Sequence, residues 1–245
     1  MPTHIYTRLG DWDHVIAGNR GAAEAALAHP PGDRGELVWD EFAHAIEYLV
    51  YVHLQQGDDA AAARETARLE AVPNLQPGAK TAFHLASIPS RVALERGDWA
   101  AAAALEPRQP ATLDWDRHAW PEAIVRFASG LGAARTGHTD KARLQHAELE
   151  RLEAATRTRG EDLFARHVHV RALALQGWIA QASGDEAAAR ARLGEAAGLE
   201  ARLPKPPVTP GPTLPAYETL GDLLMAQRAP AEAPAEARAF TARTK

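Results

Sequence analysis

The chain alternates between stretches whose apolar residues recur at helical spacing and short stretches rich in glycine, aspartate or proline. One helical stretch is EFAHAIEYLVYVHLQQ (41–56), and after a Gly-Asp pair the alanine-rich amphipathic stretch extends to residue 72. Apolar residues three and four positions apart share one face of an α-helix, which packs against a neighbour. Glycine supplies the positive φ that ends the first helix, and aspartate can cap the second. The pattern therefore predicts a helix, a tight turn and a second helix.

The Gly-Asp pair, or a close variant, recurs along the whole chain. The turn glycines are 47, 40, 40 and 47 residues apart, at Gly10, Gly57, Gly97, Gly137 and Gly184. The phrase MPTHIYTRLGDW (1–12) also returns as IPSRVALERGDW (88–99). Repeats of this length are typical of stacked helix pairs. We therefore expect a single all-α helical-repeat domain over residues 1–245, with the architecture of an α–α superhelix (solenoid) of five to six units. The expected units are approximately 1–35, 36–78, 79–112, 113–160, 161–203 and 213–245, and a proline-rich spacer is expected at 203–215.

Small residues recur at fixed distances from the turn glycine, where they let paired helices approach closely. Five residues after it stand Ala62, Ala102, Ala142 and Ala189. Seven residues before it stand Thr3, Ser90, Gly130, Gly177 and, in a sixth unit, Gly221. This pattern, as in GLGAARTGHTDKA, resembles the tetratricopeptide repeat family in a degenerate form. The usual period of that family is about 34 residues, so the units here carry longer connections.

The resemblance implies that the first helix of each unit lines a concave inner face. The positions that it places there include His4, His44, Glu47, Tyr51, His84, Arg91, Glu95, Trp178, Glu218 and Asp222. It also implies two polar rows, one through His44 and His84 and the other through His4, Tyr51 and Arg91. Solenoids usually bind their ligands on concave faces. We therefore take His4, His44, Glu47, Tyr51, His84, Arg91 and Trp178 as candidate ligand-binding residues.

The chemistry of the predicted cluster suits a polar ligand. Arg91 offers a planar, charged fork that matches a carboxylate or phosphate, and Tyr51 can donate a hydrogen bond. A small polar or anionic ligand would therefore fit. Glu47 or Glu95 could instead neutralise Arg91 in a structural ion pair.

A metal site is not favoured by the histidine pattern. His44 and His84 could converge from neighbouring helices, but adding His4 requires irregular geometry. The Glu41-x-x-His44 spacing occurs in di-iron bundles, which need a second such motif. The matching stretch of the third unit is Thr81-x-x-His84, so the second carboxylate is absent. The chain also lacks a phosphate-binding Gly-Lys-Ser/Thr loop, His-Glu-x-x-His and Gly-x-Ser-x-Gly. We expect no metal, no cofactor and no assigned catalytic residue.

Composition narrows the class of protein further. The net charge of −5 disfavours a nucleic-acid binder that relies on a basic face. The absence of cysteine excludes disulfides and thiolate chemistry. The sequence contains neither an apolar run of about 20 residues nor a signal-peptide pattern, so we expect no membrane association and a cytoplasmic location.

The leading hypothesis is a non-catalytic module that binds a peptide or protein segment on its concave face. The alternative is a protein that binds a small molecule or a metal with the His/Tyr/Glu/Arg cluster, and this class includes enzymes. A helical-repeat fold does not decide between them. A further local prediction concerns Pro89, which falls inside a helix and should bend it near Leu85, because proline cannot donate to that carbonyl.

Overall fold

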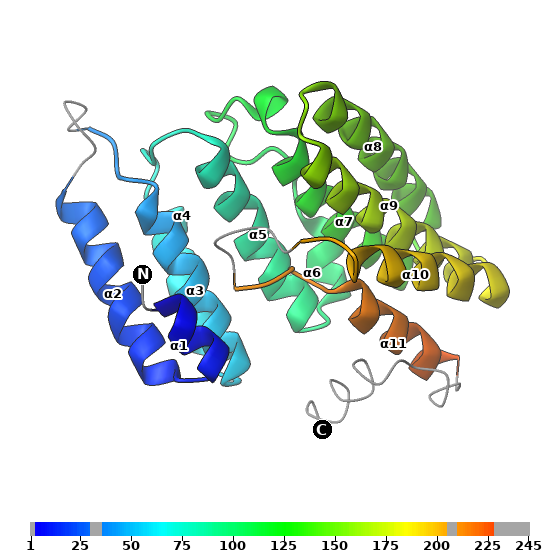
Figure 1. Ribbon diagram of the computed structural model, residues 1–245, viewed down its shortest axis with the longest axis horizontal. Coiled ribbons are helices and arrows are strands. Elements are labelled where there is room, and N and C mark those ends of the chain that lie inside the picture. The colour runs from blue at the N-terminus through cyan, green and yellow to red at the C-terminus, as the bar shows by residue number, and fades with distance from the viewer. Residues whose placement is uncertain (1–2, 30–35, 205–209, 228–245) are drawn as a thin grey trace.

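The chain is all-helical over residues 3–29, 36–204 and 210–227, which are the residues that the computed structural model describes (Figure 1). These residues contain no β-strand, only one isolated bridge between Val38 and Leu75. The helices are α1 (Thr3–Leu9), α2 (Trp12–Ala28), α3 (Glu41–Gln55), α4 (Asp59–Glu70), α5 (Ala79–Glu95), α6 (Trp99–Ala104), α7 (Ala119–Arg135), α8 (Thr139–Thr158), α9 (Asp162–Ala182), α10 (Glu186–Glu200) and α11 (Ala216–Ala226), with a 3-10 turn at Trp115–Arg117. The all-α prediction is confirmed.

The turn chemistry predicted from the Gly-Asp pairs is also confirmed. The five turn glycines have φ between 63° and 82°, a left-handed conformation that favours glycine. The carboxylates of Asp11, Asp58, Asp98 and Asp185 accept a hydrogen bond from the backbone N–H three residues later. These bonds satisfy donors that the first turn of a helix leaves unpaired. In the fourth unit His138 holds the cap position, and its side chain makes no capping bond.

Small residues allow close helix contacts where the repeat pattern placed them. A Cβ added to Gly177 of α9 would lie 2.8 Å from Leu193 Cγ of α10, inside normal contact distance. Ala62, Ala102, Ala142 and Ala189 are completely buried. The two helices of a unit therefore pack against each other through side chains that cannot be enlarged without strain.

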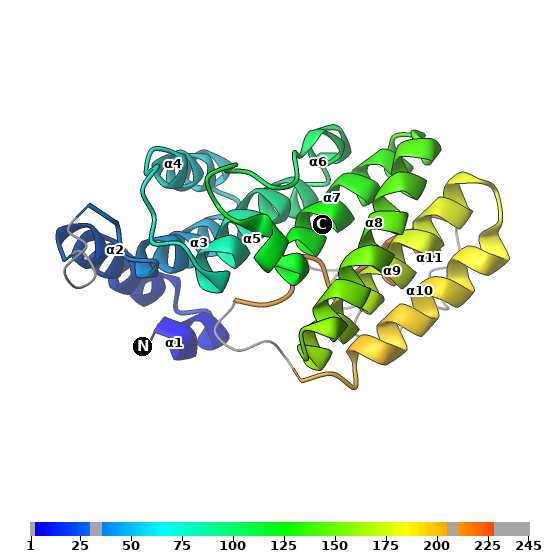
Figure 2. The same ribbon diagram turned by 90° about the horizontal axis from the view of Figure 1, so that it is seen from above.

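The first helices of successive units pack side by side. Contacts join α3 to α5, α5 to α7, α7 to α9 and α9 to α11. Figure 2 shows α4 and α6 together on one side of this row, and a chain segment crossing on the opposite side. We call the surface of α3, α5, α7 and α9 under that segment the inner face.

The crossing segment, residues 210–215, leads directly into α11, and we call it the strap. Figures 1 and 2 both show it passing across α5 before α11 begins. Thr213 and Leu214 of the strap are buried, with exposed fractions of 5% and 8%. The predicted proline-rich spacer (203–215) therefore includes a packed part of the fold.

Three sequence predictions have other outcomes. Helix α5 continues without interruption through Pro89, so the proline does not end it, and a bend at this position stays a prediction. Residues 1–2, 30–35, 205–209 and 228–245 lie outside the described residues. Part of the predicted first unit (1–35) and most of the predicted last unit (213–245) fall within those ranges.

Candidate functional site

Three histidines from three helices meet at the N-terminal end of the inner face. His4 Nε2 of α1 lies 3.4 Å from His44 Nε2 of α3, and the rings of His44 and His84 have centroids 5.2 Å apart. His4 also stacks on Tyr48, at 5.1 Å between centroids. His4 therefore contacts His44 and Tyr48, not Tyr51 as the predicted row implied, because the short α1 packs against the earlier turns of α3.

Burial favours the uncharged imidazoles of His4 and His44. Burial, with the charge of His84 as a second cause, lowers the pKa of His44 to about 4. The pKa of His4 is lowered mainly by burial as well. Of two neutral imidazoles, one can donate an N–H to the other, which accounts for the close approach of their Nε2 atoms.

Next to the histidines lies a buried ionic group made by Glu47, His84 and Arg91. His84 Nδ1 bonds Glu47 Oε2, and Glu47 Oε1 lies 3.4 Å from Arg91 Nη2. The exposed fraction of each of the three residues is 2% or less. Burial alone would raise the pKa of Glu47, but His84 and Arg91 hold it below its ordinary value. The carboxylate is therefore ionised and compensated within the protein, as a buried charge requires.

Arg91 joins this group to the strap. Its Nη2 donates to the Gly211 carbonyl at 2.8 Å, and its Nη1 donates to the Pro212 carbonyl at 3.3 Å. The guanidinium also bonds Glu95 at 2.9 Å and lies over the Tyr51 ring, 5.3 Å from its centroid. The structural ion pair that the sequence left open is thus what the structure contains, and Arg91 is not free for an external carboxylate or phosphate.

Beyond Arg91 the inner face becomes acidic. Burial and the nearby charges of Asp222 and Glu95 raise the pKa of Glu218 to about 8. Burial also raises the pKa values of Asp222 and Glu95. Within the described residues, Glu218 and Asp222 form neither an ion pair nor a hydrogen bond through their side chains.

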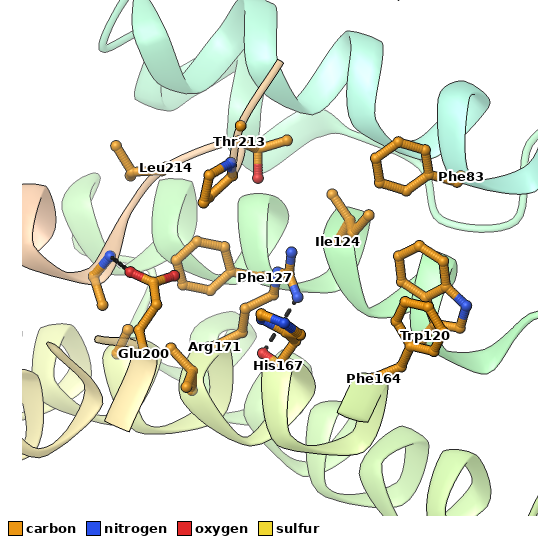
Figure 3. A pocket seen from close by; sticks show the side chains of 15 residues that line it. Phe83, Trp120, Ile124, Phe127, Phe164, His167, Arg171, Glu200, Thr213 and Leu214 are labelled. Atoms are coloured by element: carbon orange, nitrogen blue, oxygen red, sulfur yellow. Dashed lines mark hydrogen bonds between the residues drawn. The ribbon is translucent and has the colours of Figure 1, made fainter. Parts of the chain in front are cut away.

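The strap also lines a partly aromatic pocket of the inner face, where Figure 3 shows Thr213 and Leu214 across from Phe83, Trp120 and Phe164. Trp120 stacks on Phe164 at 4.3 Å between centroids, and Phe83 adjoins Trp120 at 5.2 Å. The cavity left between these rings, Arg171 and strap residues 211–214 has a volume of about 30 Å³. That volume is enough for water but not for a larger molecule. With the strap in place, this region is filled.

Trp178 does not join the cluster. The guanidinium carbon of Arg135 lies over its ring, 4.2 Å from the ring centroid. The same guanidinium carbon also lies over the Trp99 ring, 4.3 Å from that centroid. Stacking between arginine and indole is favourable, and here it links the third, fourth and fifth units. The structure thus brings His4, His44, Glu47, Tyr51, His84 and Arg91 together and leaves Trp178 apart.

Within the part of the chain that the structure describes, no group of three or more His, Asp or Glu side chains is arranged to hold a metal ion. In the same part, no helix combines the length and the apolar character needed to cross a bilayer. Comparison with protein-family models, with curated proteins and with solved structures found no match for this chain.

The sequence did not indicate two participants in this site. Tyr48 is not at one of the predicted inner-face positions of α3, although it lies one helical turn from both His44 and Tyr51. In the structure it contacts His4 and His44. The strap carbonyls are backbone groups, which no residue pattern identifies. A contact across 120 residues of chain depends on how all the intervening helices pack.

Proposed function

We propose that this chain is a helical-repeat protein, an α–α superhelix of the tetratricopeptide type, that binds an extended peptide or protein segment on its inner face. The observation that supports this proposal is the pair of bonds from Arg91 to the carbonyls of Gly211 and Pro212. Main chain without regular secondary structure already lies there, held by a charged side chain. Main-chain carbonyls are common to all peptides, so the same groups can hold a segment of another protein.

The surroundings of Arg91 supply the other requirements of a peptide site. Leu214 of the strap packs on the same face as the aromatic residues Phe127 and Trp120. Peptide recognition combines main-chain hydrogen bonds, which give affinity, with pockets for side chains, which give specificity. Because Glu47 and Glu95 orient and neutralise Arg91, its geometry is fixed before a ligand arrives, which reduces the entropy cost of binding.

The charges favour a basic or neutral segment over an anionic one. The guanidinium of Arg91 is compensated by Glu47 and Glu95. Glu218 and Asp222 form no ion pair among the described residues, although the charge of Arg135 acts on Asp222. A lysine or arginine side chain of the bound segment would supply a positive charge and allow these carboxylates to ionise. This favours a basic segment over the anionic ligand that Arg91 alone suggested.

The alternative, a small-molecule or metal site at the histidines, has less support. The 3.4 Å between His4 Nε2 and His44 Nε2 is compatible with two ligands on one ion. However, zinc sites need at least three protein ligands, and the nearby His84 is engaged by Glu47. The hydroxyl of Ser87 lies beside Glu47, but Ser87 is completely buried, which does not favour an enzyme.

The test uses a fluorescein-labelled peptide with the strap sequence PGPTLPA (210–216) and measures binding by fluorescence anisotropy. In the unaltered chain the strap occupies the site, so we expect weak binding. The variant Thr213→Glu/Leu214→Asp places charges in buried positions and should release the strap. We expect this variant to bind the peptide at least tenfold more tightly, because the intramolecular competitor is removed.

Arg91→Gln in the released-strap background should reduce peptide affinity by roughly tenfold or more, the loss expected when a charged hydrogen bond is removed. Arg96→Gln is the matched control, because Arg96 follows the same helix but pairs with Asp59 outside the inner face. Circular dichroism checks that each variant is helical. Absence of peptide binding by the released-strap variant, or equal binding with and without Arg91, would refute the proposal.

A further inference from the structure

A second, larger cavity lies on a different side of α5 from the strap. Its volume is about 530 Å³, and it is enclosed by α4, the α4–α5 connection, α5, the segment that follows α6, and one residue of α7. Helix α5 turns His84 and Arg91 toward the buried cluster and Leu85 and Pro89 toward this cavity. Cavities of roughly 300–1,000 Å³ are the size that accommodates small molecules. The two sites are therefore separate in space and in chemistry.

The floor of this cavity is apolar. It is formed chiefly by aliphatic side chains, namely Leu69, Val72, Leu75, Leu85, Ile88 and Leu113. Pro73, Pro77, Pro89 and Pro110 complete the lining with rings that carry no backbone N–H. The lining thus offers contact area for a hydrocarbon and few donors for a polar one.

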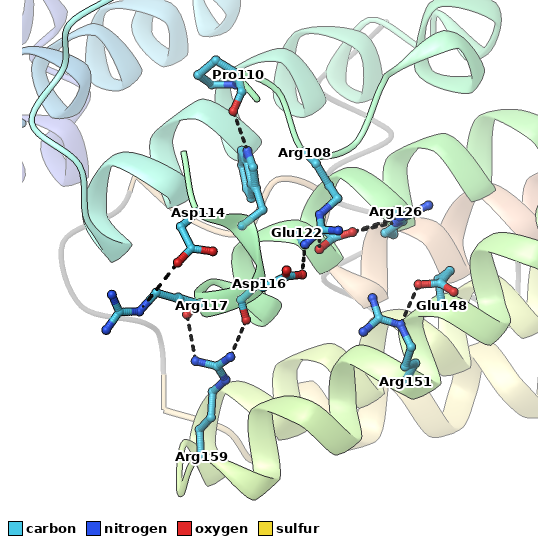
Figure 4. A network of polar contacts seen from close by, with 11 residues as sticks. Arg108, Pro110, Asp114, Asp116, Arg117, Glu122, Arg126, Glu148, Arg151 and Arg159 are labelled. Atoms are coloured by element: carbon cyan, nitrogen blue, oxygen red, sulfur yellow. Dashed lines mark hydrogen bonds and ion pairs between the residues drawn. The ribbon is translucent and has the colours of Figure 1, made fainter. Parts of the chain in front are cut away.

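The outer wall of the cavity takes part in a network of polar contacts, which Figure 4 shows. This wall belongs to residues 105–113, and Arg108 within it has a φ of 68°, a left-handed conformation that is unfavourable for a residue other than glycine. The Arg108 guanidinium pairs with Asp116 and lies 3.5 Å from Glu122.

A further bond fixes the same wall, since the indole N–H of Trp115 donates to the Pro110 carbonyl at 3.0 Å. The 3-10 turn that carries Trp115 is in turn held by Arg159 of α8, which donates to the Arg117 carbonyl at 3.3 Å. A strained residue persists only where its surroundings determine its conformation. The cavity is therefore a built feature of the fold and does not depend on a chance opening between mobile segments.

The charged residues of the lining are all acidic. They are Glu70 at the end of α4 and Glu106 after α6, and both are exposed. Among the residues that the structure describes, neither carboxylate forms an ion pair. An apolar cavity with two uncompensated carboxylates complements a molecule that has an apolar body and a positive charge.

We propose that this cavity binds a small amphiphilic cation, with its hydrocarbon part on the Leu85/Ile88 floor and its ammonium group between Glu70 and Glu106. The hydrocarbon supplies most of the affinity, because burial of apolar surface is the dominant favourable contribution. The carboxylates select the sign of charge. This site does not involve the strap or the inner face, and it stands whether or not a peptide binds there.

The test compares three probes of equal chain length, n-octylamine, n-octanol and n-octanoate, by isothermal titration calorimetry at neutral pH and low salt. We expect n-octylamine to bind about fivefold more tightly than n-octanol, which corresponds to two exposed ion pairs. We expect n-octanoate to bind more weakly than n-octanol. High salt should reduce the preference for the amine.

Two variants separate the contributions of charge and cavity. Glu70→Gln/Glu106→Gln, a change at exposed positions, should abolish the preference for n-octylamine over n-octanol and leave n-octanol binding unchanged. Leu85→Trp should fill the cavity and remove binding of all three probes. Thr112→Trp, at an exposed rim position, serves the same purpose if Leu85→Trp does not fold. The proposal would be overturned if no probe bound, or if n-octylamine, n-octanol and n-octanoate bound with equal affinity. It would also be overturned if a folded Leu85→Trp or Thr112→Trp variant still bound the probes.

Discussion

Removal of the charge at Glu218 should stabilise the fold, and the gain should depend on pH. The pKa of Glu218 is about 8 in the folded chain, against an ordinary value of 4.5. A carboxyl group with a raised folded pKa contributes most to stability below its unfolded pKa. That contribution decreases as the pH rises from 4.5 to about 8, because the unfolded chain releases the proton first.

The free-energy cost of burying Glu218 at pH 7 follows from the difference between pH 7 and the pKa of this group in the unfolded chain. At pH 7 the group is ionised in the unfolded chain and mostly protonated in the folded chain, which costs about 1.4 kcal/mol for each of roughly 2.5 pH units. The result is about 3 kcal/mol. The side chain keeps some contact with solvent, so screening reduces this to on the order of 2 kcal/mol.

Glu218→Gln removes this cost, and we expect the variant to be more stable than the parent by about 2 kcal/mol at pH 7. The difference should approach zero at about pH 4 and be largest above pH 8. Urea unfolding followed by circular dichroism at each pH gives the free energies of unfolding. Glu24→Gln, at an exposed position of α2, is the control and should show no pH-dependent gain. If Glu218→Gln is no more stable at pH 7, or if its gain is the same at pH 4, the reasoning is wrong.

Two further predictions concern stability. Gly177→Ala should destabilise the chain by about 1–3 kcal/mol in urea unfolding, because the added methyl lies 2.8 Å from Leu193. Gly194→Ala in α10, which meets nothing within 4 Å, should instead stabilise by about 0.5–1 kcal/mol, and equal effects of both changes would contradict the packing argument. His44 has a folded pKa of about 4, so it should destabilise the chain as the pH falls from 6.5 to 4, by up to about 3 kcal/mol. His44→Gln should flatten this part of the stability profile relative to the parent, and an unchanged profile would show that His44 titrates normally.

Local chemistry explains which parts of the fold were predictable. A glycine at Gly57 and a carboxylate at Asp58 act on backbone groups one to three residues away, so their roles can be predicted from the sequence alone. The burial of Ala102 and the close contact at Gly177 follow from helical spacing for the same reason. The same turn residues and the same small residues recur along the sequence, so the same helix–turn–helix contacts recur along the chain. This recurrence made the all-α arrangement predictable.

The candidate site was predictable only in part. His44, Glu47, His84 and Arg91 meet because equivalent positions of neighbouring units lie side by side. The contact of Arg91 with the strap was not predictable, since the prolines of the strap show no helical or strand periodicity. Trp178, predicted on the same face, lies apart from this cluster and stacks on Arg135 of α7, a pairing between side chains of neighbouring helices that the sequence does not specify.

The strap has a consequence for how the molecule unfolds. In a row of repeats each unit contacts only its neighbours, so the ends can melt while the middle stays folded. The bond from Arg91 to Gly211 joins residues 120 positions apart and ties the third unit to the start of α11. Loss of α11 would therefore also disturb a buried guanidinium in the middle of the row. We expect this coupling to make the array melt as one cooperative unit, with the slower folding that accompanies contacts distant in sequence.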